Sequence, residues 1–141
     1  MTTPSIVENV CFTSTESFGI IKIPRSGFVT SFKLIHVSGF AKCAPDSTSY
    51  WGCMPYYPTN EVSIVIADDQ GQKIVPPGAP GLNYAVPGAD VTSKELNLPV
   101  NSPYEVRKGQ ELRLYHAEVF VGWHVGDNVG SQCVNIILSY N

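Results

Sequence analysis

Aromatic side chains gather in one short stretch in the middle of the sequence. Residues 50–58 hold Trp51, Tyr56 and Tyr57 among prolines and a glycine. Rings held on a proline-rich loop present flat apolar faces, and the apolar face of a pyranose ring stacks on such a surface. The stretch therefore indicates a sugar-binding surface; the alternative is that these rings form a small core beneath the loop.

Polar groups lie close together in a second stretch, near the end of the chain. It contains His116, Glu118, Trp123, Asp127 and Asn128. The Asp-Asn pair can accept hydrogen bonds from neighbouring hydroxyl groups and donate to them. The carboxylates offer the oxygen ligands that calcium binds. The alternatives are an ordinary Asp-Asn turn and structural roles for the histidines.

The two stretches together predict one ligand surface. Its predicted members combine rings with hydrogen-bonding groups: Trp51, Tyr56, Tyr57, His116, Trp123, Asp127 and Asn128. Calcium is the one cofactor considered, and its candidate ligands are Glu118 and Asp127. A third acidic pair, Asp68-Asp69, is followed by Gln-Gly, a sequence typical of a hairpin turn, so we expect it to be structural.

Catalytic patterns are missing from the sequence. A glycosidase needs two facing carboxylates, and nothing brings Glu61, Glu111 and Glu118 together. Neither a nucleophile-elbow motif nor a phosphate-binding or dinucleotide-binding loop is present. We therefore expect a protein that is not an enzyme.

Composition narrows the class of partner. The 141 residues carry a net charge of −3, only 15% are charged, and Lys and Arg form no cluster, so nucleic acid is a poor candidate. No run approaches the roughly 20 apolar residues of a membrane span. The length predicts one domain, residues 1–141.

Four cysteines indicate a secreted protein with disulfide bonds. Cys11 and Cys133 lie near the two ends of the chain, and Cys43 and Cys53 lie close together. Four cysteines allow three pairings; buried thiols are the alternative, and zinc is disfavoured because no Cys-x-x-Cys pair exists. The N-terminus lacks the basic and apolar regions of a signal peptide, so the chain is either cytosolic or a mature form with an added initiator Met, and the cysteines favour the mature form.

Short runs rich in β-branched residues, bounded by turn residues, indicate strands. About eight strands predict an all-β fold, an antiparallel β-sandwich or jelly roll. In such a fold the first and last strands are neighbours, which favours a Cys11–Cys133 bridge and a Cys43–Cys53 bridge across a loop. The strand-like runs are residues 19–23, 28–37, 62–67, 72–75, 95–100, 111–116 and 133–140, and residues 118–123 continue the apolar pattern after 111–116.

Three stretches of the sequence resemble a group of secreted domains in cnidarians and other marine invertebrates. They are residues 26–39, residues 50–53, and residues 108–115 together with Gly126-Asp127-Asn128 and Cys133-Val134. The resemblance covers the chain from about Gly27 to its C-terminus. It implies an extracellular setting and a lectin-like role.

The leading hypothesis is a secreted, non-catalytic, carbohydrate-binding module. Glycans would be its partners, and a homo-oligomer is expected because single lectin sites bind weakly. The alternative is a structural or self-assembling matrix or interaction protein that uses exposed aromatic residues and strand edges. A pore-forming protein would need a long amphipathic hairpin, and residues 13–17 are too short for one.

Overall fold

The computed structural model describes residues 3–13, 17–41, 49–52, 61–77, 84–117, 120 and 130–141. The described part is an all-β structure. Its strands are β1 (Ser5–Thr13), β2 (Gly19–Lys22), β3 (Gly27–Gly39), β4 (Glu61–Val62), β5 (Ile64–Asp68), β6 (Lys73–Val75), β7 (Tyr84–Ala85), β8 (Glu95–Val106), β9 (Glu111–His116) and β10 (Ser131–Tyr140).

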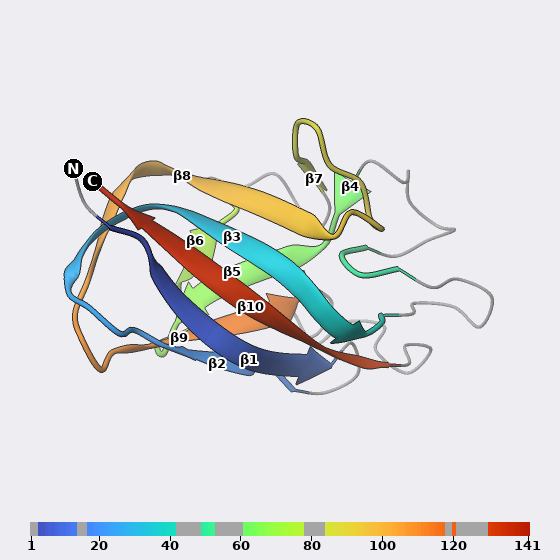
Figure 1. The fold of residues 1–141 in the computed structure, drawn as a ribbon, viewed down its shortest axis with the longest axis horizontal. Helices are drawn as coiled ribbons and strands as arrows, with labels where there is room; N and C mark the ends of the chain where they lie inside the picture. The colour runs from blue at the N-terminus through green and yellow to red at the C-terminus, as the bar shows by residue number, and fades with distance from the viewer. Residues whose placement is uncertain are drawn as a thin grey trace.

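Two four-stranded antiparallel sheets face each other (Figure 1). The front sheet has the order β1-β10-β3-β8 and the rear sheet β2-β9-β5-β6, while β4 and β7 form a separate ribbon. The pairs β1/β10, β2/β9, β3/β8 and β5/β6 are nested, as if one long hairpin were rolled up. This is a jelly roll, which confirms the predicted fold class.

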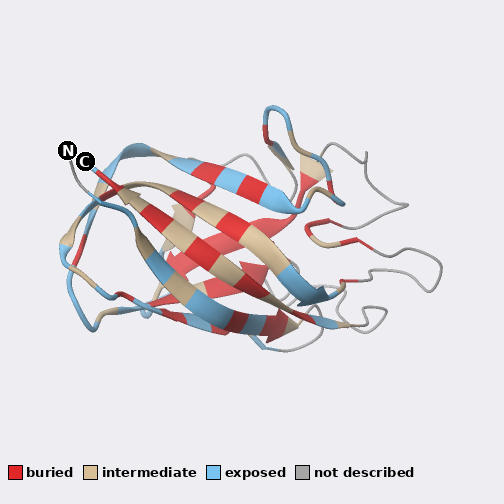
Figure 2. Ribbon diagram, viewed as in Figure 1, coloured by how far each residue is buried: buried red, intermediate tan, exposed pale blue. Residues whose placement is uncertain are grey.

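The core lies between the two sheets. Along β10, buried and less buried residues alternate, and the stripes in Figure 2 show the same period on β3. This period places every second side chain on the inner face of a strand. Large side chains from both sheets are fully buried there, among them Phe32, Leu34, Ile66, Leu114 and Ile136. Burial of each contributes about 1.5–3 kcal/mol to the free energy of unfolding.

Strand β5 is buried on both faces. Ile64 and Ile66 belong to the main core, whereas Val65 and Ala67 belong to a second cluster on the outer face of the rear sheet. That second cluster also contains Tyr115, with Phe18 and Phe120 packed against it. Burial on both sides explains why β5 is almost continuously apolar in sequence.

The hairpin between β5 and β6 confirms that the adjacent aspartates are structural. The carboxylate of Asp68 accepts hydrogen bonds from the backbone N–H groups of Gln70 (2.9 Å) and Gln72 (2.8 Å). Gly71 has a φ of 82°, a left-handed conformation that favours glycine. The carboxylate of Asp68 is therefore engaged in closing a turn.

A disulfide joins Cys11 of β1 to Cys133 of β10, as predicted. The two residues are direct partners across the strands, with their Cα atoms 4.0 Å apart. Because the bridge closes a loop spanning 122 positions, the chain-entropy model assigns it about 4–5 kcal/mol. Cys43 and Cys53 lie outside the described residues.

The two ends of the sandwich differ. Both chain termini lie at one end, where Arg25 donates a hydrogen bond to the carbonyl of Thr3 and accepts one from the Tyr140 hydroxyl (3.1 Å) (Figure 1). The last residues of β3 and β9 and the first residues of β10 lie at the opposite end. Within the described part there is no helix long and apolar enough to cross a membrane.

Candidate functional site

The described residues that flank the two loops singled out in the sequence lie together at one end of the sandwich. We call this the loop end, and define it by those flanking residues. These residues are 40–41, 49–52, 116–117 and 130–132. The backbone N–H of Phe40 donates to the carbonyl of Ser131 (3.1 Å), so the exit from β3 lies beside the entry to β10.

Glycine makes the close approach between β3 and β10 possible. Gly39 has a φ of 85°, and a Cβ atom at this position would lie 2.1 Å from the carbonyl oxygen of Ser131. Any larger residue would push the two strand ends apart. The spacing between the two loops thus depends on this glycine.

Trp51 is the buried anchor of the first loop. Its side chain has 0% exposure, and its indole N–H donates to the carbonyl of Ser93 at 2.6 Å. Its backbone N–H donates to the carbonyl of Val91 at 3.1 Å. A ring buried in this way does not reach the surface, so in this structure Trp51 belongs to the hydrophobic core.

The turn that holds Trp51 was not recognised in the sequence. The carboxylate of Asp90 accepts hydrogen bonds from the backbone N–H (2.8 Å) and hydroxyl (3.0 Å) of Thr92, and the Thr92 backbone bond is the main reason why the pKa of Asp90 is lowered. The Ser93 hydroxyl in turn accepts from the Asp90 backbone N–H (3.0 Å). The Asp-x-Thr-Ser sequence is the signal that could have indicated this turn.

Tyr50 and His36 form a stacked pair beside Trp51. Their ring centroids are 3.6 Å apart with an interplanar angle of 14°, and both residues are partly exposed. A ring nitrogen of His36 lies 2.8 Å from the carbonyl of Gly39, which fixes the imidazole at the end of β3. This pair is the described aromatic surface of the first loop.

His116, the last residue of β9, is fully buried at 0% exposure. Burial lowers the pKa of its imidazole from 6.5 to about 4, and a hydrogen bond with the backbone of Gly52 opposes that shift. The imidazole is therefore neutral at pH 7. Like Trp51, this predicted ligand residue lies beneath the surface in this structure.

Both ends of the second loop are bonded to the first. At its start, His116 hydrogen-bonds with the backbone of Gly52. At its end, the side-chain amide of Gln132 donates to the carbonyl of Tyr50. Gln132 is itself buried at 2% exposure. Residues 49–52 consequently serve as a shared base for the two loops.

The remaining predicted site residues lie outside the described residues, and their membership of the ligand surface stays a prediction. These remaining site residues are Tyr56, Tyr57, Glu118, Trp123, Asp127 and Asn128.

Within the described ranges, no group of three or more His, Cys, Asp or Glu side chains is placed to hold a metal ion.

Comparison with known proteins relates the fold to one solved structure. No family model and no curated protein matches the sequence. The structure is similar to AJLec, a lectin of the sea anemone Anthopleura japonica, with a TM-score of 0.85 over 97% of this chain and 98% of that chain. The two sequences are 20% identical, so the likeness establishes the fold, and it agrees with the resemblance to cnidarian domains.

Proposed function

We propose that this chain is a non-catalytic, carbohydrate-binding, lectin-like module whose ligand surface lies at the loop end. The observation that carries the proposal is the shared base of the two loops. His116 and Gln132 bond both ends of the second loop to residues 49–52. Loops held on a rigid sandwich are where binding residues of β-proteins concentrate.

The predicted residues divide into two roles. Tyr56, Tyr57 and Trp123 provide rings for the apolar faces of sugars, and Asp127 and Asn128 take their hydroxyl groups. Trp51 and His116 do not contact the ligand but support the loop end from the interior, because both are fully buried. If calcium is bound, Glu118 and Asp127 are its proposed ligands.

We also propose that the module is extracellular and acts as a homo-oligomer. The Cys11–Cys133 disulfide and the likeness to a sea anemone lectin support the extracellular setting. Oligomerisation would compensate for weak single-site binding, because several linked sites on one glycan surface raise the overall affinity. The absence of catalysis is part of the same proposal.

A glycan array probed with the purified protein, with and without calcium, tests the proposed function. We expect binding to a restricted set of glycans, and no binding under either condition would refute the proposal. Trp123→Ala should abolish the signal, whereas Phe28→Ala should retain it. Phe28 is a matched control because it is 49% exposed and lies near the opposite end of β3.

A charge-matched pair of variants tests the hydrogen-bonding role. Asp127→Asn should reduce glycan binding at least about 10-fold, the loss expected for one charged hydrogen bond of about 1.5 kcal/mol. Asp69→Asn makes the same change on an exposed residue of the β5–β6 turn and should leave binding unchanged. Equal effects of the two variants would contradict a ligand surface at the loop end.

The self-assembly hypothesis also has a structural observation in its favour. Three large apolar residues of the front sheet are exposed by about half: Ile6 (52%), Phe28 (49%) and Val37 (48%). Exposed apolar residues on a sheet are candidates for contact with another molecule. Light scattering that shows a large open assembly, together with a blank glycan array, would favour this function instead.

A further inference from the structure

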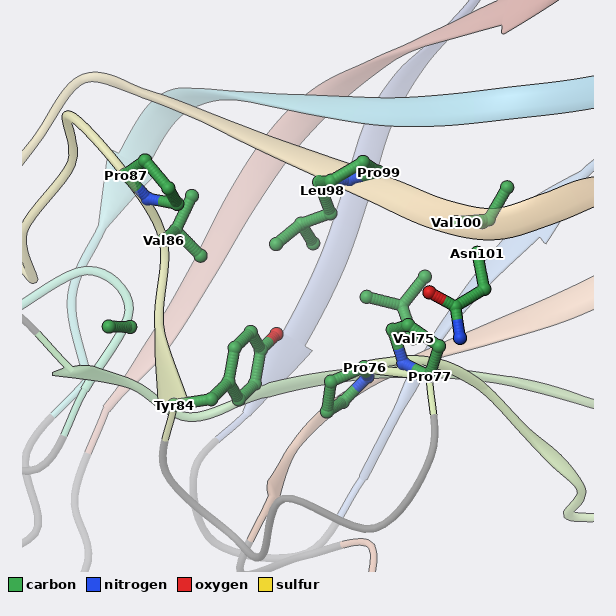
Figure 3. Close-up of a pocket in the computed structure, with 11 residues that line it drawn as sticks. Val75, Pro76, Pro77, Tyr84, Val86, Pro87, Leu98, Pro99, Val100 and Asn101 are labelled. Atoms are coloured by element: carbon green, nitrogen blue, oxygen red, sulfur yellow. The ribbon is translucent and has the colours of Figure 1, made fainter.

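A small apolar pocket opens on one side of the sandwich. It lies between β6 and β8, which are the outermost strands of the rear and front sheets, and the β7 segment borders it (Figure 3). Its volume is about 180 Å³, and residues 75–77, 84–87 and 98–101 line it. None of the loop-end residues contributes to it.

The pocket has an apolar floor and stiff walls. Val75, Val86 and Leu98 are buried, and Figure 3 shows Val86 and Leu98 directed toward the ring of Tyr84. Four of the lining residues are prolines, which have a fixed φ and no backbone N–H. These prolines are Pro76, Pro77, Pro87 and Pro99. The walls of the pocket are therefore restricted in backbone conformation and poor in hydrogen-bond donors.

Polar groups in the pocket are few. Among the described residues that line it, none has an acidic or basic side chain. The hydroxyl of Tyr84 is directed to the carbonyl of Ile64, to which it donates at 2.5 Å, and burial raises its pKa. The exposed amide of Asn101 is the polar side chain at the rim. A charged group or a polyhydroxylated ring would lose its hydration here without new hydrogen bonds to replace it. Burial of an uncharged apolar group would instead contribute favourably to the free energy of binding.

The volume limits the size of the ligand. An apolar cavity of about 150 Å³ in another protein holds benzene, whereas pockets for drug-sized ligands are roughly 300–1,000 Å³. A pocket of about 180 Å³ fits one six-membered ring. We propose that it binds the uncharged aromatic ring of a small amphiphile, whose polar substituent stays at the rim beside Asn101.

This site differs in chemistry from the proposed sugar surface. The loop end offers hydrogen-bonding groups to a polar ring, whereas the pocket offers apolar contact to a ring without hydroxyl groups. Among the described residues, the pocket and the loop end have none in common, so the pocket can bind its ligand whether or not the loop end binds glycans.

An NMR titration of the methyl-labelled protein with phenol and with indole tests the proposal. We expect saturable shifts of the Val75, Val86 and Leu98 methyl groups, with dissociation constants in the millimolar range, and no such shifts with glucose. The absence of saturable shifts with both aromatic probes would overturn the proposal. So would shifts confined to methyl groups outside the pocket.

Two substitutions to phenylalanine provide a matched comparison. Val86→Phe places a ring inside the pocket and should weaken phenol binding at least 10-fold. Asn97→Phe adds the same side chain at an exposed residue that precedes Leu98 but does not line the pocket, and it should leave the affinity within twofold of the wild type. Equal binding by both variants would overturn the proposal. If Val86→Phe does not fold, as judged by its methyl spectrum, the shifts of the wild-type methyl groups decide the question.

Discussion

The buried histidine at the loop end predicts a specific loss of stability in acid. The pKa of His116 is 6.5 in an ordinary environment and about 4 in the folded chain. Between these values the unfolded chain binds a proton that the folded chain does not. The contribution of His116 to stability is therefore complete above pH 6.5 and is lost as the pH falls toward 4.

The size of the effect follows from the two pKa values. At about 1.36 kcal/mol per pH unit, the gap between 6.5 and about 4 corresponds to about 3 kcal/mol. Most of this, about 2 kcal/mol, should be lost between pH 7 and pH 4.5. That is a large share of the roughly 5–15 kcal/mol that stabilises a typical domain.

Urea unfolding at several pH values measures the effect in the wild type and in His116→Gln, which cannot titrate. We expect the free energy of unfolding of the variant to fall by about 2 kcal/mol less than that of the wild type between pH 7 and pH 4.5. Ser63→Ala changes a neighbouring buried polar residue without a titrating group, and it should keep the wild-type pH dependence. Identical pH dependence in wild type and His116→Gln would refute the assignment of His116 as a buried, neutral imidazole.

Three further variants test the frame around the loops. In urea unfolding, the double variant Cys11→Ala/Cys133→Ala should lose about 4–5 kcal/mol of unfolding free energy. A loss below about 1 kcal/mol would contradict the inference that the disulfide stabilises the protein by closing a long loop of the unfolded chain. Gly52→Ala should destabilise the protein by about 1–3 kcal/mol in the same assay, because its new Cβ would lie 2.3 Å from a valine side chain. An unchanged midpoint of urea unfolding would show that the two groups do not touch. Trp51→Phe removes the indole N–H that donates to Ser93, so thermal unfolding should show a loss of about 1–3 kcal/mol, and a Tm equal to that of the wild type would show that this bond contributes nothing.

Strands with a regular apolar period could be predicted from the sequence. The strict alternation of residues 111–116 gave the bounds of β9, Glu111–His116. The prediction for β8 included Pro99 but ended at Val100, because Pro103 argues against a continued strand, whereas β8 extends to Val106. Both prolines are tolerated there since β8 is the outermost strand of its sheet and needs a hydrogen-bonding partner on one side only. The two-residue strand β7 is too short to show any period.

The burial of two candidate site residues could not be predicted from the sequence. Residue type alone suggested that Trp51 and His116 contact a ligand, but their burial depends on partners distant in sequence. Ser93, which accepts the indole hydrogen bond, lies 42 positions from Trp51. Gln132 lies 82 positions from Tyr50, and the sequence around Gln132 does not indicate that its side chain bonds to Tyr50. Such pairings are set by the topology of the jelly roll, which the local pattern does not contain.

The meeting of the two chain termini through Arg25 has a practical consequence for display. A carrier, a flexible linker or a second module fused at either terminus attaches at the end of the sandwich opposite the loop end (Figure 1). In tandem or surface-immobilised copies the attachment would therefore not cover the loop end. Joining the two ends and opening the chain between Asp69 and Gln70, in the exposed hairpin turn, would keep the new termini away from the loop end, because β5 begins beside His116 and runs toward the end that holds the original termini (Figure 1).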